Sequence, residues 1–196
     1  MKKWIIIAVV ALAAILLYNT FKGSYNRMVQ LDEGIKTQWA QVENVYQRRA
    51  DLIPNLVRTV QGYADFERET LTQVIEARAK ATQTTINPEN LTPENIQQFQ
   101  QAQGQLSSAL SRLMVVVERY PDLKANQNFL ELQAQLEGTE NRIAVERRKF
   151  NEETKEYNIY IRQFPRNFLA GMYGFQQRPL FEAQAGAERV PEVQFE

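Results

Sequence analysis

The sequence predicts an all-α protein, in which an N-terminal transmembrane helix leads into an antiparallel, up-and-down bundle of four helices. Two observations carry this prediction. A long apolar run follows two lysines at the N-terminus. Beyond it, apolar residues recur every three or four positions, as on one face of a helix, and strand-like alternation is nearly absent. We expect an anchor over residues 1–23, a bundle over 24–164, and a short helix with an extended tail over 165–196.

The composition narrows the chemistry that the chain can perform. Its 196 residues include no cysteine and no histidine. This excludes disulfides, thiol nucleophiles, Cys/His zinc sites and a histidine base. The 23 basic and 23 acidic residues balance, so no net charge attracts nucleic acid. We therefore expect no cofactor, no bound metal, no nucleic-acid partner and no enzymatic activity.

The first element is the apolar run WIIIAVVALAAILL, extended by the softer YNTF to residue 21. As a helix, residues 4–21 span ~27 Å, close to the ~30 Å hydrocarbon core of a bilayer. Aliphatic side chains favour insertion and no charge opposes them. The predicted anchor residues are Trp4, Ile5, Ile6, Ile7, Val9, Val10, Leu12, Ile15, Leu16 and Leu17.

A cleaved signal peptide is the competing interpretation of this run, because residues 11–13 (ALA) resemble a cleavage site. Four more apolar residues, 14–17, follow where a polar start is expected, so we favour an uncleaved anchor. Lys2 and Lys3 favour a cytoplasmic N-terminus, although basic residues beyond the run weaken the bias. We expect a single-pass protein of the inner membrane with its bundle outside.

Apolar residues that recur at helical spacing, which we call apolar stripes, predict the next helices. Two stripes precede a loop at residues 84–95, where Thr92-Pro93-Glu94 supplies an N-cap, a proline in the first turn and a first-turn acid. A third helix therefore begins there and ends near Pro121. The stripes consist of Tyr25, Met28, Leu31, Ile35, Trp39, Val42 and Tyr46, then Leu56, Val60, Tyr63, Leu71, Val74 and Ile75, then Ile96, Phe99, Leu106, Leu110, Leu113 and Val117.

The last long helix is the most regular element. Its apolar residues fall at seven-residue steps, which predicts a continuous buried seam: Phe129, Leu136, Ile143, Phe150, Tyr157 and Phe164. Pro165 ends this helix, and a short helix or turn follows.

The stretch RRADLIPNLV, residues 48–57, places a proline inside the pattern of the first two stripes. A proline in a helix interior costs ~3 kcal/mol, whereas in a first turn it costs almost nothing. With Asp51 as N-cap, Pro54 would lie in such a first turn, so we favour a corner there. A kink remains the alternative, because the apolar residues keep the same helical spacing before and after Pro54. Arg48, Arg49 and Asp51 are then expected in a capped, solvated turn.

Three stretches resemble one known family. RRADLIPNLVRTVQGYADFERETLTQVIEARAKA, NFLELQAQLEGTENRIAVERRKFNEETKEYN and FPRNFLAGMYGF, with a following FEA, are similar to signatures of the LemA family of bacterial membrane proteins. The resemblance covers nearly the whole chain and implies an N-terminally anchored helical bundle. It implies no reaction and no catalytic residues. It points to other envelope proteins as partners, a membrane metalloprotease among the candidates.

Several residues are candidates for packing or binding. Gly138 interrupts the most regular helix, which predicts either a notch for a ligand or close packing under a bulky residue such as Trp39; we favour packing. Asn26 and Asn158 each follow a tyrosine, and both are predicted near the membrane. A buried asparagine there either fixes helix register or binds a ligand; we favour register.

The charged residues of the last helix and the C-terminal tail are further candidates for a functional site. Acidic and basic side chains line the middle of the last helix, where a solvated face is favoured over acid–base or metal chemistry: Glu137, Glu140, Glu146, Arg142, Arg147 and Arg148. The C-terminal tail cannot form its own core, so it either straps the bundle or grips a partner.

The sequence thus predicts a membrane-anchored, non-enzymatic scaffold or adaptor for protein partners. A lipid- or small-ligand-binding bundle is the alternative. A carboxylate-based, metal-dependent enzyme is less favoured, and a homo-oligomer is a further possible state.

Overall fold

The computed structural model describes residues 2–62 and 67–182, and every regular element in these ranges is helical, as predicted. The described residues form six α-helices and one 3-10 turn, not four helices. They are α1 (Lys2–Gln61), α2 (Arg68–Gln83), η1 (Pro88–Asn90), α3 (Pro93–Val117), α4 (Pro121–Lys124), α5 (Gln127–Arg162) and α6 (Arg166–Tyr173).

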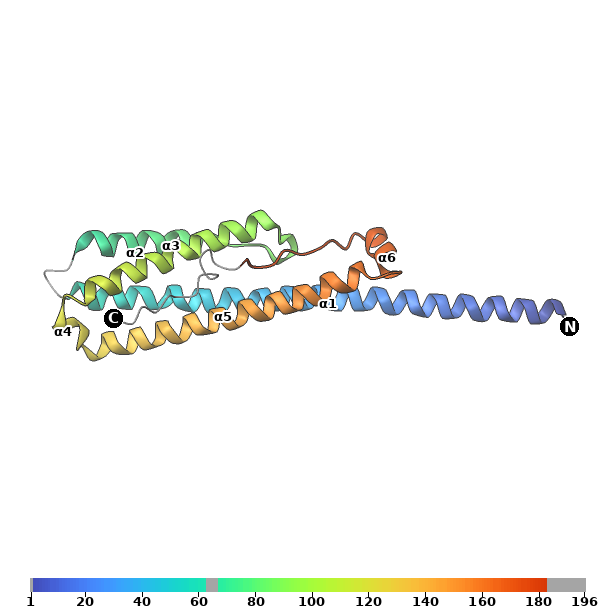
Figure 1. Cartoon of the computed structure of the whole chain (residues 1–196), viewed down its shortest axis with the longest axis horizontal. Helices are drawn as coiled ribbons and strands as arrows, with labels where there is room; N and C mark the ends of the chain where they lie inside the picture. The colour runs from blue at the N-terminus through green and yellow to red at the C-terminus, as the bar shows by residue number, and fades with distance from the viewer. Residues whose placement is uncertain (1, 63–66, 183–196) are drawn as a thin grey trace, which may run out of the picture.

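Helix α1 dominates the shape of the molecule. Its 60 residues extend ~90 Å, and its N-terminal part projects beyond all other helices (Figure 1). This part is long and apolar enough to cross a membrane by length and composition. The predicted anchor side chains, from Trp4 to Leu17, are all exposed there.

The predicted corner at Asp51 and Pro54 is wrong, because α1 continues without a break to Gln61. Pro54 has no N–H to donate to the carbonyl oxygen of Ala50, one turn earlier. The side chain of Arg78 in α2 replaces that donor: its Nε lies 2.7 Å from the Ala50 oxygen. Asp51 caps nothing and instead accepts a hydrogen bond from Gln47 at 2.7 Å.

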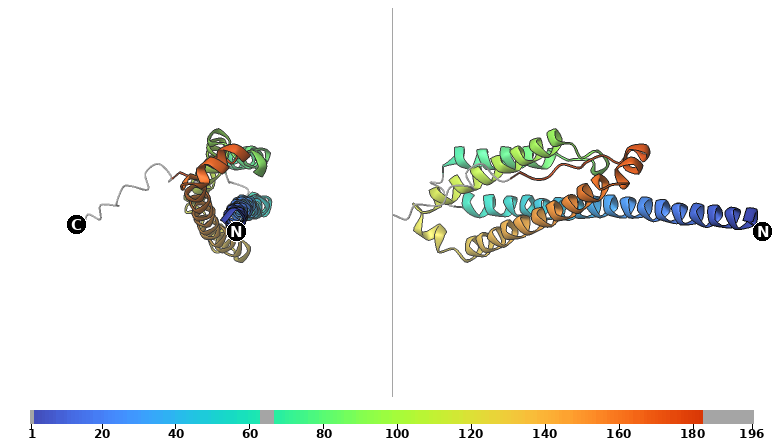
Figure 2. Two further views of the ribbon diagram at one scale, coloured as in Figure 1. Left: turned by 90° about the vertical axis from the view of Figure 1, so that its right-hand side faces the viewer. Right: turned by 45° about the vertical axis from the view of Figure 1, so that its right-hand side comes forward.

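Four helices pack side by side to form what we call the helical body: α2, α3, α5 and α1 from Met28 onward. The chain runs in one direction in α1 and α3 and in the other in α2 and α5 (Figure 1). Helix α5 packs along α1, and α3 packs on α2. Helix α4 joins α3 to α5 at the far end, whereas α6 lies across the end from which α1 projects (Figure 2).

The core of the body consists of two hydrophobic clusters placed one after the other along the helices. The cluster nearer the projecting end surrounds Trp39, whose ring lies 5.3 Å from Phe99 and 5.5 Å from Phe150. The far cluster includes Leu56, Leu113 and Phe129.

The seven-residue seam of α5 is buried from Phe129 to Tyr157. Its last predicted member, Phe164, is 81% exposed, because α5 already ends at Arg162.

Candidate functional site

A buried arginine lies between the two hydrophobic clusters. Arg49 belongs to the middle of α1 and is only 1% exposed, so the predicted solvated turn is wrong for this residue. Its neighbour Arg48 is exposed. The reason is the helical phase: Arg49 follows Tyr46 by three positions and precedes Ile53 by four, which places it on the core face of α1.

The guanidinium group of Arg49 joins three helices. Its Nη1 donates to Glu140 Oε1 of α5 at 2.6 Å and to Ser107 Oγ of α3 at 2.8 Å. Its Nη2 donates to Gln103 Oε1 at 2.7 Å, and Gln103 in turn donates to the carbonyl oxygen of Ala81 in α2 at 3.2 Å. A buried charge of this kind is tolerated only when paired and hydrogen-bonded. The result is a polar layer through all four helices of the body.

Burial and hydrogen bonding shift the pKa values of titratable groups in and near this layer. Burial raises the pKa of Tyr46, whose ring lies 5.1 Å from the guanidinium carbon of Arg49. Further along α5, hydrogen bonds from Lys149 and Gln38 lower the pKa of Glu146.

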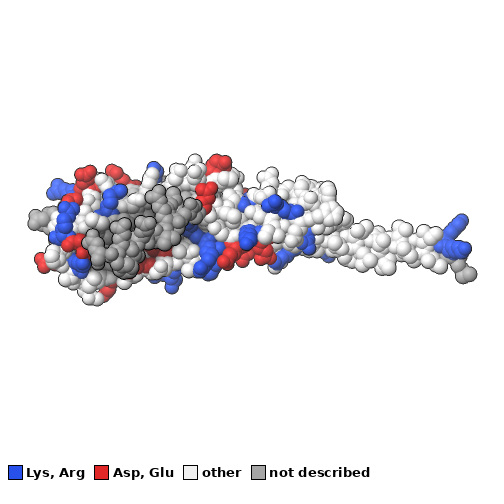
Figure 3. All heavy atoms as spheres, in the orientation of Figure 1, with Lys and Arg blue, Asp and Glu red and all other residues white. Residues whose placement is uncertain are grey.

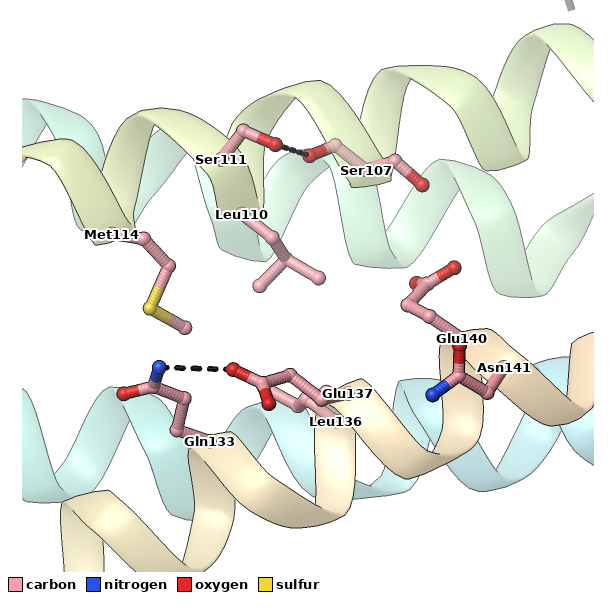
Figure 4. Close-up of a pocket in the computed structure, with 9 residues that line it drawn as sticks. All are labelled: Ser107, Leu110, Ser111, Met114, Gln133, Leu136, Glu137, Glu140 and Asn141. Atoms are coloured by element: carbon pink, nitrogen blue, oxygen red, sulfur yellow. Dashed lines mark hydrogen bonds between the residues drawn. The ribbon is translucent and has the colours of Figure 1, made fainter.

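A groove opens beside the polar layer, between α3 and α5. It has a volume of about 580 Å³. Leu110 and Met114 of α3 point across it toward α5, whose Gln133, Glu137 and Glu140 side chains point toward α3 (Figure 4). Its lining residues are Ser107, Leu110, Ser111, Met114, Gln133, Leu136, Glu137, Glu140 and Asn141. A second cavity of about 490 Å³ shares Ser107, Ser111 and Glu140 with it and reaches Arg49 and Glu182. The two cavities therefore form one groove along α5.

The chain after α6 lies along α5 and ends its described course at this groove. The side-chain amide of Asn158 accepts from the backbone N–H of Arg178 at 2.9 Å and donates to the Arg178 carbonyl at 2.8 Å. Asn151 makes the same pair of bonds with Phe181, at 2.8 and 3.0 Å. The seven helical residues from Asn151 to Asn158 span ~10.5 Å along α5, and the three extended residues from Arg178 to Phe181 span ~10 Å. The spacing of the two asparagines therefore matches that of the backbone groups they bind.

Other side chains complete the attachment of this tail segment, residues 175–182. The Tyr157 hydroxyl donates to the Gln176 carbonyl at 2.9 Å, and burial, with a smaller effect of Asp32, raises the pKa of Tyr157 to about 12. The Arg178 guanidinium donates to Asp32 Oδ1 at 2.9 and 3.0 Å. The described part of the tail is thus a strap on the body; residues 183–196 lie outside the described ranges.

The strap ends between the two walls of the groove. The carbonyl oxygen of Glu182 accepts from Gln100 of α3 at 3.2 Å and from Arg147 of α5 at 3.0 Å. Phe181 fills the adjacent core, stacked on Trp39 with ring centroids 5.7 Å apart.

The other candidates from the sequence fall in different places. Gly138 is exposed and a Cβ atom there would meet nothing within 4 Å, so the expected packing under Trp39 is wrong. Asn26 is exposed on α1. Asn158 binds the strap and not another helix, which corrects its expected role in helix register.

Two of the candidate carboxylates in the middle of α5 form ion pairs. Glu140 pairs with Arg49, and Glu146 lies 2.9 Å from Lys149. Glu137 accepts a hydrogen bond from Gln133. Within the part of the chain that the structure describes, no three acidic side chains converge as metal ligands.

The sequence contained signals for two of the residues that were missed. Arg49 occupies a position of the apolar stripe that Ile53 and Leu56 continue, and a charged residue in such a position indicates a buried, paired charge. Asn151, seven residues before Asn158 and likewise preceded by an aromatic residue, indicates a repeated contact along α5. No comparable signal pointed to Arg78 or Gln103.

The sequence of the chain is similar to those of several known proteins. The sequence model of the LemA family matches residues 38–195. Magnetosome protein MamQ 2 of Paramagnetospirillum magneticum is 26% identical, over 93% of this chain and 72% of the relative. MamQ of Magnetospirillum gryphiswaldense is also 26% identical, over 93% and 74%. Protein LemA of Metamycoplasma hominis is 24% identical, over 88% and 75%. The chain belongs to the LemA family.

Proposed function

We propose that the protein is a non-enzymatic scaffold of the bacterial inner membrane, which binds an extended segment of a partner protein in the groove between α3 and α5. The observation that carries this proposal is the way in which the body holds its own strap. Asn151 and Asn158 bind backbone N–H and C=O groups, not side chains, so the surface recognises an extended peptide.

The groove continues this binding surface beyond the strap. Glu182 lines the second cavity, and further along α5 and α3 the lining includes the amide groups of Gln133 and Asn141 and the hydroxyl group of Ser111. Such groups pair with a peptide backbone without demanding one side-chain sequence. The acids of α5 support a non-enzymatic role, because Glu140 and Glu146 are held by cations.

Anchoring would be provided by the projecting part of α1. We propose a single pass with the N-terminus in the cytoplasm and the body outside, because Lys2 and Lys3 precede the apolar run.

Site-specific photo-crosslinking in native membranes tests the groove. A photo-reactive amino acid replaces Asn141 in the groove or, as the control, Glu76 on the exposed side of α2. We expect position 141 to crosslink one segment of another envelope protein, and a synthetic peptide of that segment to compete. Position 76 should give no such product.

Truncation after Glu182 separates a partner from the chain's own C-terminus, since it leaves the strap intact. The crosslink at position 141 should persist in the truncated chain. The proposal fails if positions 141 and 76 give the same products, or if position 141 reacts only with residues 183–196 of its own chain.

A further inference from the structure

Helix α6 carries an apolar face that no part of the described chain covers. Phe168 is 68% exposed and Met172 is 67% exposed, and Phe164, just before the helix, is 81% exposed. Phe168 and Met172 are one helical turn apart, and the ring of Phe164 lies 5.9 Å from that of Phe168, so the three lie on one side. Leu169 and Ala170 on the other side are buried against the body. Soluble proteins rarely expose contiguous apolar surface of this kind, and such a face marks an interaction site.

The position of α6 indicates what covers this face. The helix lies across the end of the body at which α1 projects (Figures 1 and 2). A small cavity at this place is lined by Thr20 and Phe21 of α1 and by Phe164 and Leu169. The face of α6 is therefore level with the C-terminal end of the apolar run.

The charges around α6 suit an anionic surface. Residues 2–31 and 157–174, which comprise α6 and the chain beside it, contain no Asp or Glu, and the neighbouring Glu156 is paired with Arg27. Arg162 and Lys22 are exposed there, and Arg166 is half-buried against the ring of Tyr160. Beyond the body, charged atoms on the projecting part of α1 appear only at its tip (Figure 3).

The C-terminal end of α6 is fixed in place, so its apolar face has a defined orientation. Gly174 adopts a left-handed conformation with φ of 78°, which glycine accepts without strain. The ring of Tyr173 lies 4.8 Å from that of Tyr25 in α1, which ties α6 to the helix that leaves the body.

We propose that α6 is a second membrane contact, which lies flat in the interface of the bilayer that α1 enters. Phe164, Phe168 and Met172 insert between headgroups and acyl chains, and Arg162 and Lys22 meet lipid phosphates. An amphipathic helix with basic flanks is suited to this depth, and its attraction is strongest for anionic lipids. The inference rests on the proposed anchoring of α1, because that span brings the lipid surface to α6.

Depth-dependent fluorescence quenching tests this contact in the full chain. The protein has no cysteine, so single cysteines can be labelled with an environment-sensitive fluorophore. The positions are Phe168→Cys on α6, Leu12→Cys within the apolar run, and Val115→Cys on α3 as the matched control, since Val115 is apolar and 71% exposed. The chain is reconstituted in vesicles of phosphatidylcholine with a minor fraction of phosphatidylglycerol, and lipids carry a spin-label quencher at a shallow or a deep position.

We expect the label at position 168 to be quenched several-fold more by the shallow quencher than the label at position 115. The label at position 12 should respond most to the deep quencher. If position 168 is no more quenched than position 115 while position 12 responds, the α6 contact is overturned and the anchor stands. If position 12 also fails to respond, the proposed anchoring itself is overturned.

Discussion

At the scale of single residues, Pro54 shows how one helix depends on a side chain from another. Its ring removes the backbone donor for the Ala50 carbonyl, and Arg78 of α2 supplies a donor at 2.7 Å. Ala50 is buried, so without Arg78 its carbonyl oxygen would lose its partner without gaining full access to water.

This arrangement predicts a coupling between Pro54 and Arg78. Arg78→Met should lower the free energy of unfolding by about 1–3 kcal/mol, the cost of an unsatisfied buried acceptor. In a Pro54→Ala background the backbone N–H at position 54 restores the bond, so the same change should cost clearly less. Urea unfolding of the four chains in detergent, followed by circular dichroism, measures both costs; equal costs would contradict the account.

Arg49 makes a second residue-level prediction, with a matched control beside it. Arg49→Ala should lower the free energy of unfolding by about 2–4 kcal/mol, because it leaves a gap and removes the partners of Gln103 and Ser107. Arg48→Ala, at an exposed position, should change it by less than ~0.5 kcal/mol. A loss in Arg49→Ala as small as that expected for Arg48→Ala, measured by urea unfolding, would show that the polar layer contributes little.

At the scale of elements, Asn151 and Asn158 hold the backbone of the strap. In the double variant Asn151→Ala, Asn158→Ala, the amide hydrogens of Arg178 and Phe181 lose their acceptors. We expect them to exchange with solvent roughly tenfold faster or more, while the helices keep their protection. Hydrogen exchange with mass spectrometry measures this. Asn26→Ala, an exposed asparagine on α1, should leave the strap unchanged, and an unaffected strap in the double variant would refute its role.

The strap also predicts a dependence on alkaline pH. The pKa of Tyr157 is raised from 10.0 to about 12 in the folded chain, chiefly by burial, so the folded state favours the neutral hydroxyl that donates to Gln176. This contribution to stability is full below pH ~10 and is lost as the pH rises toward about 12. The difference in unfolding free energy between the natural chain and Tyr157→Phe should therefore shrink over that interval. A constant difference would contradict the assignment.

The sequence predicted these elements well where their residues are local neighbours. Capping by Thr92 begins α3 as expected, with its hydroxyl accepting from the Asn95 N–H at 3.2 Å. The apolar stripe that crosses Pro54 without a slip was the correct signal for α1, but the replacement donor Arg78 is 28 positions away from Ala50. Such a partner depends on how α2 packs, which periodicity alone does not specify.

At the scale of the whole molecule, the groove was not predicted because periodicity within one helix does not specify how the helices pack together. Its walls come from α3 and α5, whose apolar stripes face α2 and α1, so the space between them follows from the packing of four helices together. The sequence did predict the all-α fold and the exposed apolar end of α1, because each depends on composition and spacing within one segment.

With the proposed anchor in the bilayer, the unbroken course of α1 gives the molecule a defined height above the membrane. From residue 21 to Gln61 the helix rises ~60 Å, or slightly less with an ordinary tilt. A corner at Pro54 would have shortened this rise, whereas a continuous helix sets the far end of the body well away from the lipid.

Energy transfer to acceptor lipids measures this height. A donor fluorophore on Arg58→Cys, near the far end of α1, should transfer little energy to acceptors in the headgroup region, because ~55 Å separates residue 58 from the end of the apolar run. A donor on Gln30→Cys, only ~14 Å from the same point, should transfer efficiently in the same vesicles. The contrast follows if the proposed span in the bilayer and the part of α1 within the body belong to one continuous helix. Equal transfer from the two positions would mean that the body lies along the membrane, which contradicts an upright α1.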